Sequence, residues 1–172
     1  MRQKLLVVIA TVAVVAAGVF AALYFWNEPE TKTVVVKPCG ERVYGHIGSL
    51  ARKGDHYELR FDPAWLTSGV TANTAAAEDG AVEPGQPVPN DNYVVDESHR
   101  LLTYLVPPAA HVTVLVNNPT GFYSTPIPVS ELAEIVTTGK SSQRKLFEPL
   151  DSGVWIRYSN DTVCSLDQQY KP

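Results

Sequence analysis

The sequence predicts a mainly β fold, a small β-barrel or sandwich with two short helices, preceded by one N-terminal transmembrane helix. Three observations support this fold class. An apolar stretch without charges covers residues 5–26. Short runs rich in β-branched and aromatic residues recur along the rest of the chain, one of them with a clean two-residue alternation. Glycine and proline residues separate these runs at short intervals, which is typical of small all-β domains.

Residues 5–26 are long enough to cross a membrane. At about 1.5 Å per residue they span roughly 33 Å, against a hydrocarbon core of about 30 Å. Arg2 and Lys4 precede the stretch and two glutamates follow it. The positive-inside rule therefore places residues 1–4 in the cytoplasm and the C-terminal part outside a bacterial-type cell membrane. Secretion after signal-peptide cleavage is the alternative, although a signal peptide usually has an apolar core of about 7–15 residues.

The exported part is mildly acidic. It contains 12 of the 14 lysines and arginines and all 18 aspartates and glutamates, so its net charge is −6. Nucleic acid is not an expected partner, because binding to phosphates needs clustered cations and the basic residues are scattered. The expected partners are the membrane, through residues 5–26, and either another envelope protein or a small ligand.

The two cysteines, Cys39 and Cys164, lie near the two ends of the exported part. Thiols outside the cytoplasm tend to be oxidised, and an even number favours pairing. A bridge would close most of the domain into one loop and stabilise it by roughly 4–5 kcal/mol. Two separate buried thiols are the alternative. We expect the disulfide, with a tether at 27–38 and an extracytoplasmic β domain at 39–172.

The first expected pair of strands is a hairpin at residues 42–50 and 56–61. The second strand alternates apolar and polar residues, as a strand with one buried face does. Gly45 and Gly48 interrupt the first strand, and glycine in a strand marks a bulge, a bend or a close approach of backbones. The curvature of a small barrel requires such features.

The hairpin is expected to end at Pro63, because proline cannot donate a hydrogen bond to a neighbouring strand. Residues 64–69 then form a turn or short helix around Trp65. An alanine-rich helix is expected at 71–79, and a long loop rich in proline and glycine at 80–92.

The remaining elements follow from the same patterns. A run with apolar residues at nearly every position favours a strand covered on both faces, and apolar residues at helical spacing favour a helix. The expected elements are strands at 93–95, 101–106 and 111–116, a short helix at 130–136, and a closing hairpin at 154–158 and 162–166.

No catalytic, metal or cofactor site is predicted. The four histidines (46, 56, 99 and 111) contain no pair at the helical spacing of a zinc motif, and the cysteines are far apart. The chain has no Gly-x-Ser-x-Gly elbow and no phosphate-binding glycine loop. Acidic residues flank the long loop, but their spacing does not match a calcium-binding loop, so a solvated acidic loop is the expectation.

Aromatic, amide and charged residues gather around the long loop, and such side chains on loops commonly form binding sites. The expected ligand- or partner-binding residues are Asp62, Trp65, Asn90, Asp91, Tyr93, His99 and Arg100. The alternative is structural. In that case Asp62 and Asn90 cap turns, and Trp65 closes one end of the barrel.

Two motifs carry a resemblance to a family. Residues 44–50 (YGHIGSL) and 57–65 (YELRFDPAW) resemble a family of uncharacterised bacterial exported or membrane-anchored proteins. The similarity continues through 76–80, 87–91 and 102–104, so that it covers most of residues 42–116. The family has no assigned activity, and the resemblance therefore implies membership without a mechanism.

These observations favour a non-enzymatic binding or accessory module of the cell envelope, tethered to the membrane. An exported hydrolase is one alternative, with carboxylates or His99 acting near the loop at 80–100. An accessory subunit of a larger membrane complex is the other.

Overall fold

The computed structural model describes residues 39–96 and 100–170, which belong to one compact unit, Pro38–Pro172. The expected membrane anchor, its tether and His99 lie outside the described residues. Among the residues that are described, no helix has the length and apolar character needed to span a bilayer.

The described part of the domain is mainly β, with eight strands and two α-helices, which confirms the predicted class. The strands are β1 (Glu41–Lys53), β2 (His56–Ser68), β3 (Asn92–Val95), β4 (Leu102–Val106), β5 (His111–Asn118), β6 (Gly121–Ile127), β7 (Val154–Ser159) and β8 (Thr162–Gln168). The helices are α2 (Gly69–Glu78) and α3 (Val129–Thr138), and two single 3-10 turns cover Pro89–Asp91 and Leu150–Ser152.

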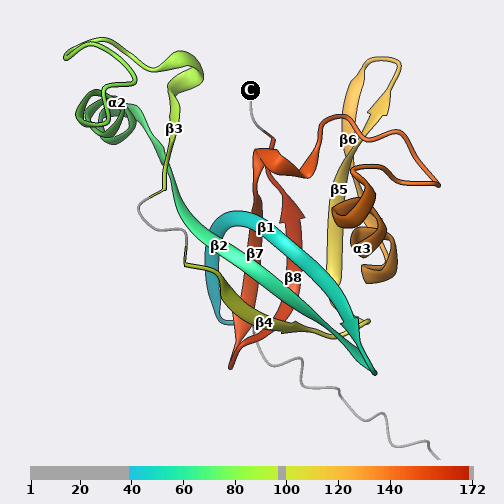
Figure 1. The fold of residues 1–172 in the computed structure, drawn as a ribbon. Coiled ribbons are helices and arrows are strands. Elements are labelled where there is room, and N and C mark those ends of the chain that lie inside the picture. Colours follow the sequence, from blue (N-terminus) through green and yellow to red (C-terminus); the bar gives the residue numbers. More distant parts are fainter. Residues whose placement is uncertain (1–38, 97–99, 171–172) are drawn as a thin grey trace, which may run out of the picture. The chain divides into compact units, whose positions relative to one another are not determined.

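Five strands, whose arrangement can be followed in Figure 1, pair in a circle and close a barrel. β1 pairs with both β2 and β7, β2 pairs with β4, and β7 pairs with β8, all antiparallel. A short parallel contact, Leu105 opposite Thr162, joins β4 to β8 and completes the circle. The circular order of the five strands is first, second, third, fifth, fourth, which is the Greek-key connectivity of an OB-type barrel.

The barrel encloses the main hydrophobic core. Side chains that alternate along β1, β2, β7 and β8 point inward, as their two-residue period requires. The largest fully buried side chains are Phe61, Leu59, Leu132, Ile156, Leu166, Val106, Val112, Val114, Val129, Val154 and Val163. Leu132 and Val129 come from α3, so this helix packs against the core with its apolar face.

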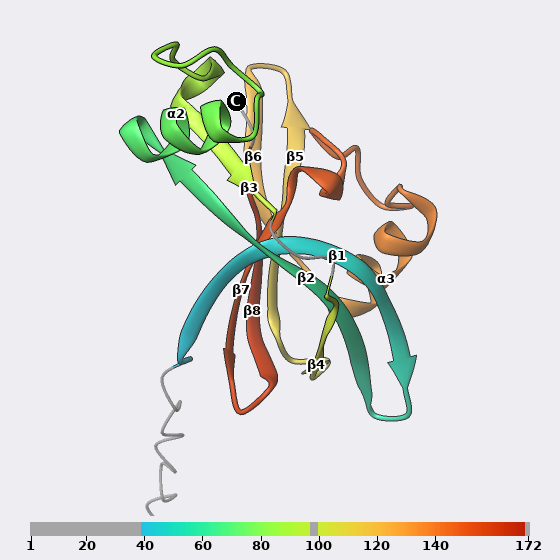
Figure 2. The same ribbon diagram turned by 60° about the vertical axis from the view of Figure 1, so that its left-hand side comes forward.

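Two substructures extend from the barrel. The β5–β6 hairpin joins through a parallel pairing of β5 with β8. The other, which we call the arm, consists of residues 65–95: the end of β2, α2, the following loop and β3 (Figure 2). β3 pairs with the end of β2, and Ala72, Ala76 and Val88 form a small apolar core within the arm.

Cys39 and Cys164 form a disulfide, with their Cα atoms 6.1 Å apart. The expected pairing is therefore confirmed. It connects the residue two positions before β1 to the middle of β8, so that it links the first and last strands of the barrel.

The glycines of β1 have the roles that their position in a strand indicates. The pairing of β1 with β2 shifts register between Ile47 and Ser49, which places Gly48 in a bulge. A Cβ atom at Gly45 would overlap the carbonyl oxygen of Asp62 and the ring of Phe61. Gly45 therefore permits the close approach of the two strands.

The end predicted for the first hairpin is wrong, and so is the turn around Trp65. β2 continues through Pro63 to Ser68. Its second neighbour changes from β4, which pairs up to Phe61, to β3, which pairs from Trp65 onward. Pro63 lies in the gap between these two neighbours, where no strand requires its missing N–H.

Two further expectations differ from the structure. β4 is not covered on both faces, because Leu102 and Leu105 are exposed while Tyr104 and Val106 are buried. β6 was not predicted, since its sequence shows no alternation of apolar and polar residues and contains Pro126. It is the edge strand of the sheet, where proline is tolerated.

Candidate functional site

Six of the seven expected binding residues are described, and three of them line two adjoining hollows beside the arm. Trp65 lines the first hollow, and Asn90 and Tyr93 line the second. Asp62 lies in β2 opposite His46, next to the first hollow. The exposed residues Asp91 and Arg100 line neither hollow.

The first hollow exists because β1 and β2 part from each other. Their pairing ends at Tyr44 opposite Ala64. Before Tyr44, β1 stays with β7, while β2 after Ala64 turns away to pair with β3 in the arm. Each strand follows a different neighbour, and a gap opens between them.

We call this gap the wedge, a hollow of about 330 Å³. It is lined by Glu41, Arg42, Val43 and Tyr44 of β1, by Pro63, Ala64, Trp65 and Leu66 of β2, and by Trp155 and Tyr158 of β7. Consecutive residues of a strand point to opposite faces of a sheet. A hollow lined by four consecutive residues of each strand therefore lies between the two strands and not on one face.

Charged and aromatic groups are held in place around the wedge. The Tyr158 hydroxyl donates a hydrogen bond to Glu41 Oε2 at 2.6 Å. This bond to a carboxylate, together with burial, raises the pKa of the Tyr158 phenol, which stays protonated at neutral pH. The Arg42 guanidinium lies 4.0 Å from the centre of the Trp155 ring, in a cation–π contact.

Tyr44 lines the wedge and also the second hollow, which lies beside it. Its hydroxyl donates to the Ser152 carbonyl oxygen at 2.7 Å, and its ring meets that of Trp155 edge-on, with centroids 5.3 Å apart. Burial, and to a lesser extent the charge of Glu148, raises the pKa of the Tyr44 phenol. Tyr44 is thus a rigid, neutral wall.

The second hollow, which we call the arm pocket, also measures about 330 Å³. Its lining is Tyr44, Leu66, Pro89, Asn90, Asn92, Tyr93, Val94, Ser152, Gln169 and Tyr170. It lies between the arm and the segments that flank β7 and β8. Tyr44 and Leu66 line both hollows, so the wedge and the arm pocket adjoin each other, and we call the two together the groove.

Hydrogen bonds stabilise the two sides of the arm pocket. On the arm side, the Tyr93 hydroxyl donates to Asp79 Oδ2 at 3.0 Å. On the barrel side, Trp155 Nε1 donates to Gln169 Oε1 at 2.7 Å. Asn90 adopts a left-handed conformation with φ of +57°, which asparagine tolerates in turns.

Several groove residues were not expected from the sequence. Arg42, Tyr44, Trp155 and Tyr158 lie in strands, far along the chain from the long loop. They reach the site only because β1 pairs with β7, and such long-range pairing leaves no local signal. The aromatic residues of the closing hairpin, Trp155 and Tyr158, which are half-buried, were the one indication that was available.

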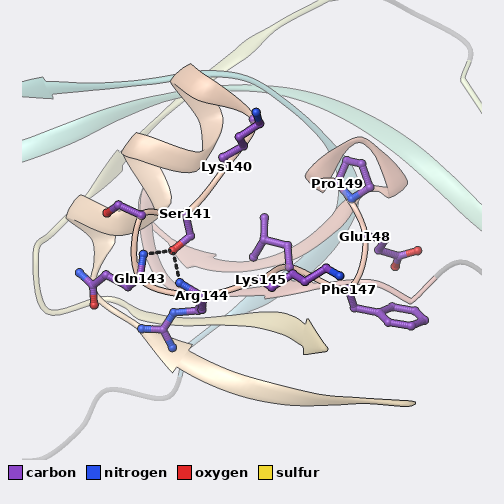
Figure 3. Close-up of a pocket in the computed structure, with 11 residues that line it drawn as sticks. Lys140, Ser141, Gln143, Arg144, Lys145, Phe147, Glu148 and Pro149 are labelled. Atoms are coloured by element: carbon purple, nitrogen blue, oxygen red, sulfur yellow. Dashed lines mark hydrogen bonds between the residues drawn. The ribbon is translucent and has the colours of Figure 1, made fainter. Parts of the chain in front are cut away.

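A third hollow, of about 630 Å³, is formed by residues 139–149 after α3 (Figure 3). Its polar groups hold the loop itself. The buried Glu131 carboxylate accepts from Arg144 Nε at 2.6 Å and Nη2 at 2.9 Å, and from the Ser141 hydroxyl at 2.6 Å. Ser141 Oγ in turn accepts from the backbone N–H groups of Gln143 and Arg144. These groups are used in folding, so we take the groove as the candidate site.

Within residues 39–96 and 100–170, no three histidine, cysteine, aspartate or glutamate side chains are grouped so that they could hold a metal ion. Comparison with protein-family models, with curated proteins and with solved structures finds no match to the chain. The function has to be argued from the groove, since a barrel fold alone does not specify one.

Proposed function

We propose that the chain is a membrane-tethered protein of the cell envelope whose extracytoplasmic domain binds a partner or ligand in the groove between the arm and the barrel. The tether rests on the charge pattern around residues 5–26. The location outside the cytoplasm also agrees with the Cys39–Cys164 disulfide, because such bonds persist in oxidising compartments.

The observation that carries the binding proposal is that the wedge and the arm pocket adjoin each other at Tyr44 and Leu66. Binding sites are concave and mostly apolar, with a few fixed polar groups, and each hollow has about the smallest volume typical of such sites. Trp65 supports the proposal further. Its side chain is 68% exposed at the edge of the wedge, and tryptophan is enriched at interfaces.

A photocrosslinking experiment tests this proposal. A benzophenone amino acid is placed at Leu66, which lines both hollows, and as a control at Glu83, an exposed arm residue that lines neither. Intact cells that naturally produce the chain are irradiated. We expect a discrete adduct from position 66, none from position 83, and loss of the adduct when Trp65→Ala is added.

Equal adducts from positions 66 and 83, or an adduct that does not depend on Trp65, would contradict binding in the groove. Absence of any adduct from position 66 would contradict the binding of a protein partner in the groove.

A further inference from the structure

We infer that the wedge takes an extended polypeptide, which inserts as an additional strand between β1 and β2. The inference rests on the proposed function and names the class of ligand. The occupant is a segment of a partner protein, recognised mainly through its backbone.

The first argument is the state of the two strand edges that border the wedge. Among the described residues, Glu41–Val43 pair only with β7, and residues 65–68 pair only with β3. In an antiparallel pair, alternate residues direct their N–H and C=O groups toward the partner and the others direct them away. Every second residue of both segments therefore presents unpaired backbone groups to the wedge.

The second argument is that residues of both edges line the same hollow. The register of β1 and β2, extended beyond Tyr44 and Ala64, would place Val43 opposite Trp65 and Arg42 opposite Leu66. The strands diverge there, and the gap contains the hollow of about 330 Å³. Since unpaired strand edges are templates for another strand, two edges on one hollow favour an extended polypeptide more strongly than one edge does.

The topology determines what kinds of pairing such a strand makes. β1 and β2 are antiparallel, so an inserted strand must be antiparallel to one and parallel to the other. It would extend into the arm pocket, because Leu66 and Tyr44 line both hollows.

The side chains around the wedge suit a peptide as well. Side chains of an inserted strand would alternate between the two faces of the sheet. On one face lie Trp155 and Arg42, and on the other lie Trp65 and Tyr158. Aromatic side chains on both faces can contact many apolar residues, so that the backbone provides recognition and the rings contribute affinity.

The test uses the full chain in detergent micelles and a phage-displayed library of random twelve-residue peptides. The enriched peptide is synthesised, and its binding is measured by calorimetry and by hydrogen–deuterium exchange. We expect the peptide to slow exchange at least about tenfold at those amides of residues 41–43 and 65–67 that face the wedge. Trp65→Ala should weaken binding by about tenfold or more. Val70→Ala, at an arm residue that is 82% exposed and outside both hollows, should change it less than about twofold.

N-methylation of the peptide separates insertion from simple edge addition. At a single edge, only alternate peptide amides donate to the protein. Between two edges, each central amide donates to one neighbour or the other, so methylation at two consecutive central residues should each weaken binding by about tenfold. An effect at alternate residues only would overturn the inference.

Three other results would also overturn it: no enriched peptide, protection confined to the arm pocket, or slow exchange, before peptide is added, of those amides of residues 41–43 and 65–67 that face the wedge. The last would show that another segment of the chain, such as residues 34–36, already fills the wedge. Groove-specific crosslinking in cells would still support the proposed function in each of these cases, with a ligand of another chemistry.

Discussion

At the scale of single residues, Gly45 decides how closely β1 and β2 approach just before they part. Its missing side chain leaves room for the Asp62 carbonyl oxygen and the Phe61 ring. Gly48 is less constrained, because a Cβ there would lie 3.2 Å from the end of the Leu101 side chain and 3.3 Å from the Arg60 carbonyl oxygen, so that neither overlaps as the Asp62 carbonyl does at Gly45. The two glycines differ in what would have to move: backbone at Gly45, and mainly a flexible side chain at Gly48.

Gly45→Ala should therefore lower the free energy of unfolding by about 1–3 kcal/mol, as expected for overpacking against a rigid neighbour. Gly48→Ala is the matched control and should cost less than about 1 kcal/mol. Urea unfolding of the full chain, followed by tryptophan fluorescence, measures both. Equal losses for the two variants would show that the approach of the strands at Gly45 is not tightly constrained.

The sequence indicated both glycines as special but not their separate roles. A bulge, a bend and a close approach all favour glycine, and only the position of the opposite strand distinguishes them. The same limit applies to the groove. Trp65, Asn90 and Tyr93 were expected there, whereas Arg42 and Tyr158 were not, because their places depend on pairing between β1 and β7.

At the scale of elements, α3 determines the conformation of the loop that follows it. Glu131 lies in the first turn of α3, is only 2% exposed, and binds Arg144 and Ser141 of the loop. Glu134, one turn later, accepts from the backbone N–H and the hydroxyl of Ser142. Only the first of these carboxylates is buried, so the two should contribute unequally.

Glu131→Gln should lower the free energy of unfolding by about 1–3 kcal/mol, because it replaces a charged acceptor and leaves the partly buried Arg144 without its counter-charge. Glu134→Gln, at an exposed pair, should cost less than about 1 kcal/mol. Chemical denaturation measures the stability, and hydrogen–deuterium exchange should show residues 141–144 opening first in Glu131→Gln. Unchanged exchange in this loop would contradict the role of Glu131.

Elements with a local signal were predicted well. The alternation in β2, the alanine-rich helix α2 and the closing β7–β8 hairpin all appear close to their expected positions. β6 and the second half of β2 were missed because each contains a proline, which argues against a strand in the chain considered alone. Both prolines are tolerated because the sheet leaves one side of the strand unpaired, and that property belongs to the sheet.

At the scale of the whole molecule, the barrel has one strong and one weak closure. β1 and β2 pair over most of their length, while β4 and β8 meet at one residue pair, Leu105 opposite Thr162. The Cys39–Cys164 disulfide attaches the start of β1 directly to β8. It therefore fixes the edge of β1 that borders the wedge, and it links the proposed location of the protein to its stability.

The disulfide makes export measurable. In intact cells, the full chain should resist labelling by a maleimide after denaturation, because both thiols are oxidised outside the cytoplasm. A chain that lacks residues 1–26 should remain in the reducing cytoplasm and be labelled at both Cys39 and Cys164. A double variant, Cys39→Ser with Cys164→Ser, controls for non-specific labelling and should take up no reagent.

In the purified full chain, reduction should lower the free energy of unfolding by roughly 4–5 kcal/mol, because it releases a long closed loop. Full labelling of both thiols in the intact chain would contradict the location outside the cytoplasm, whereas a stability loss without any difference in labelling would separate the structural role of the disulfide from the question of export.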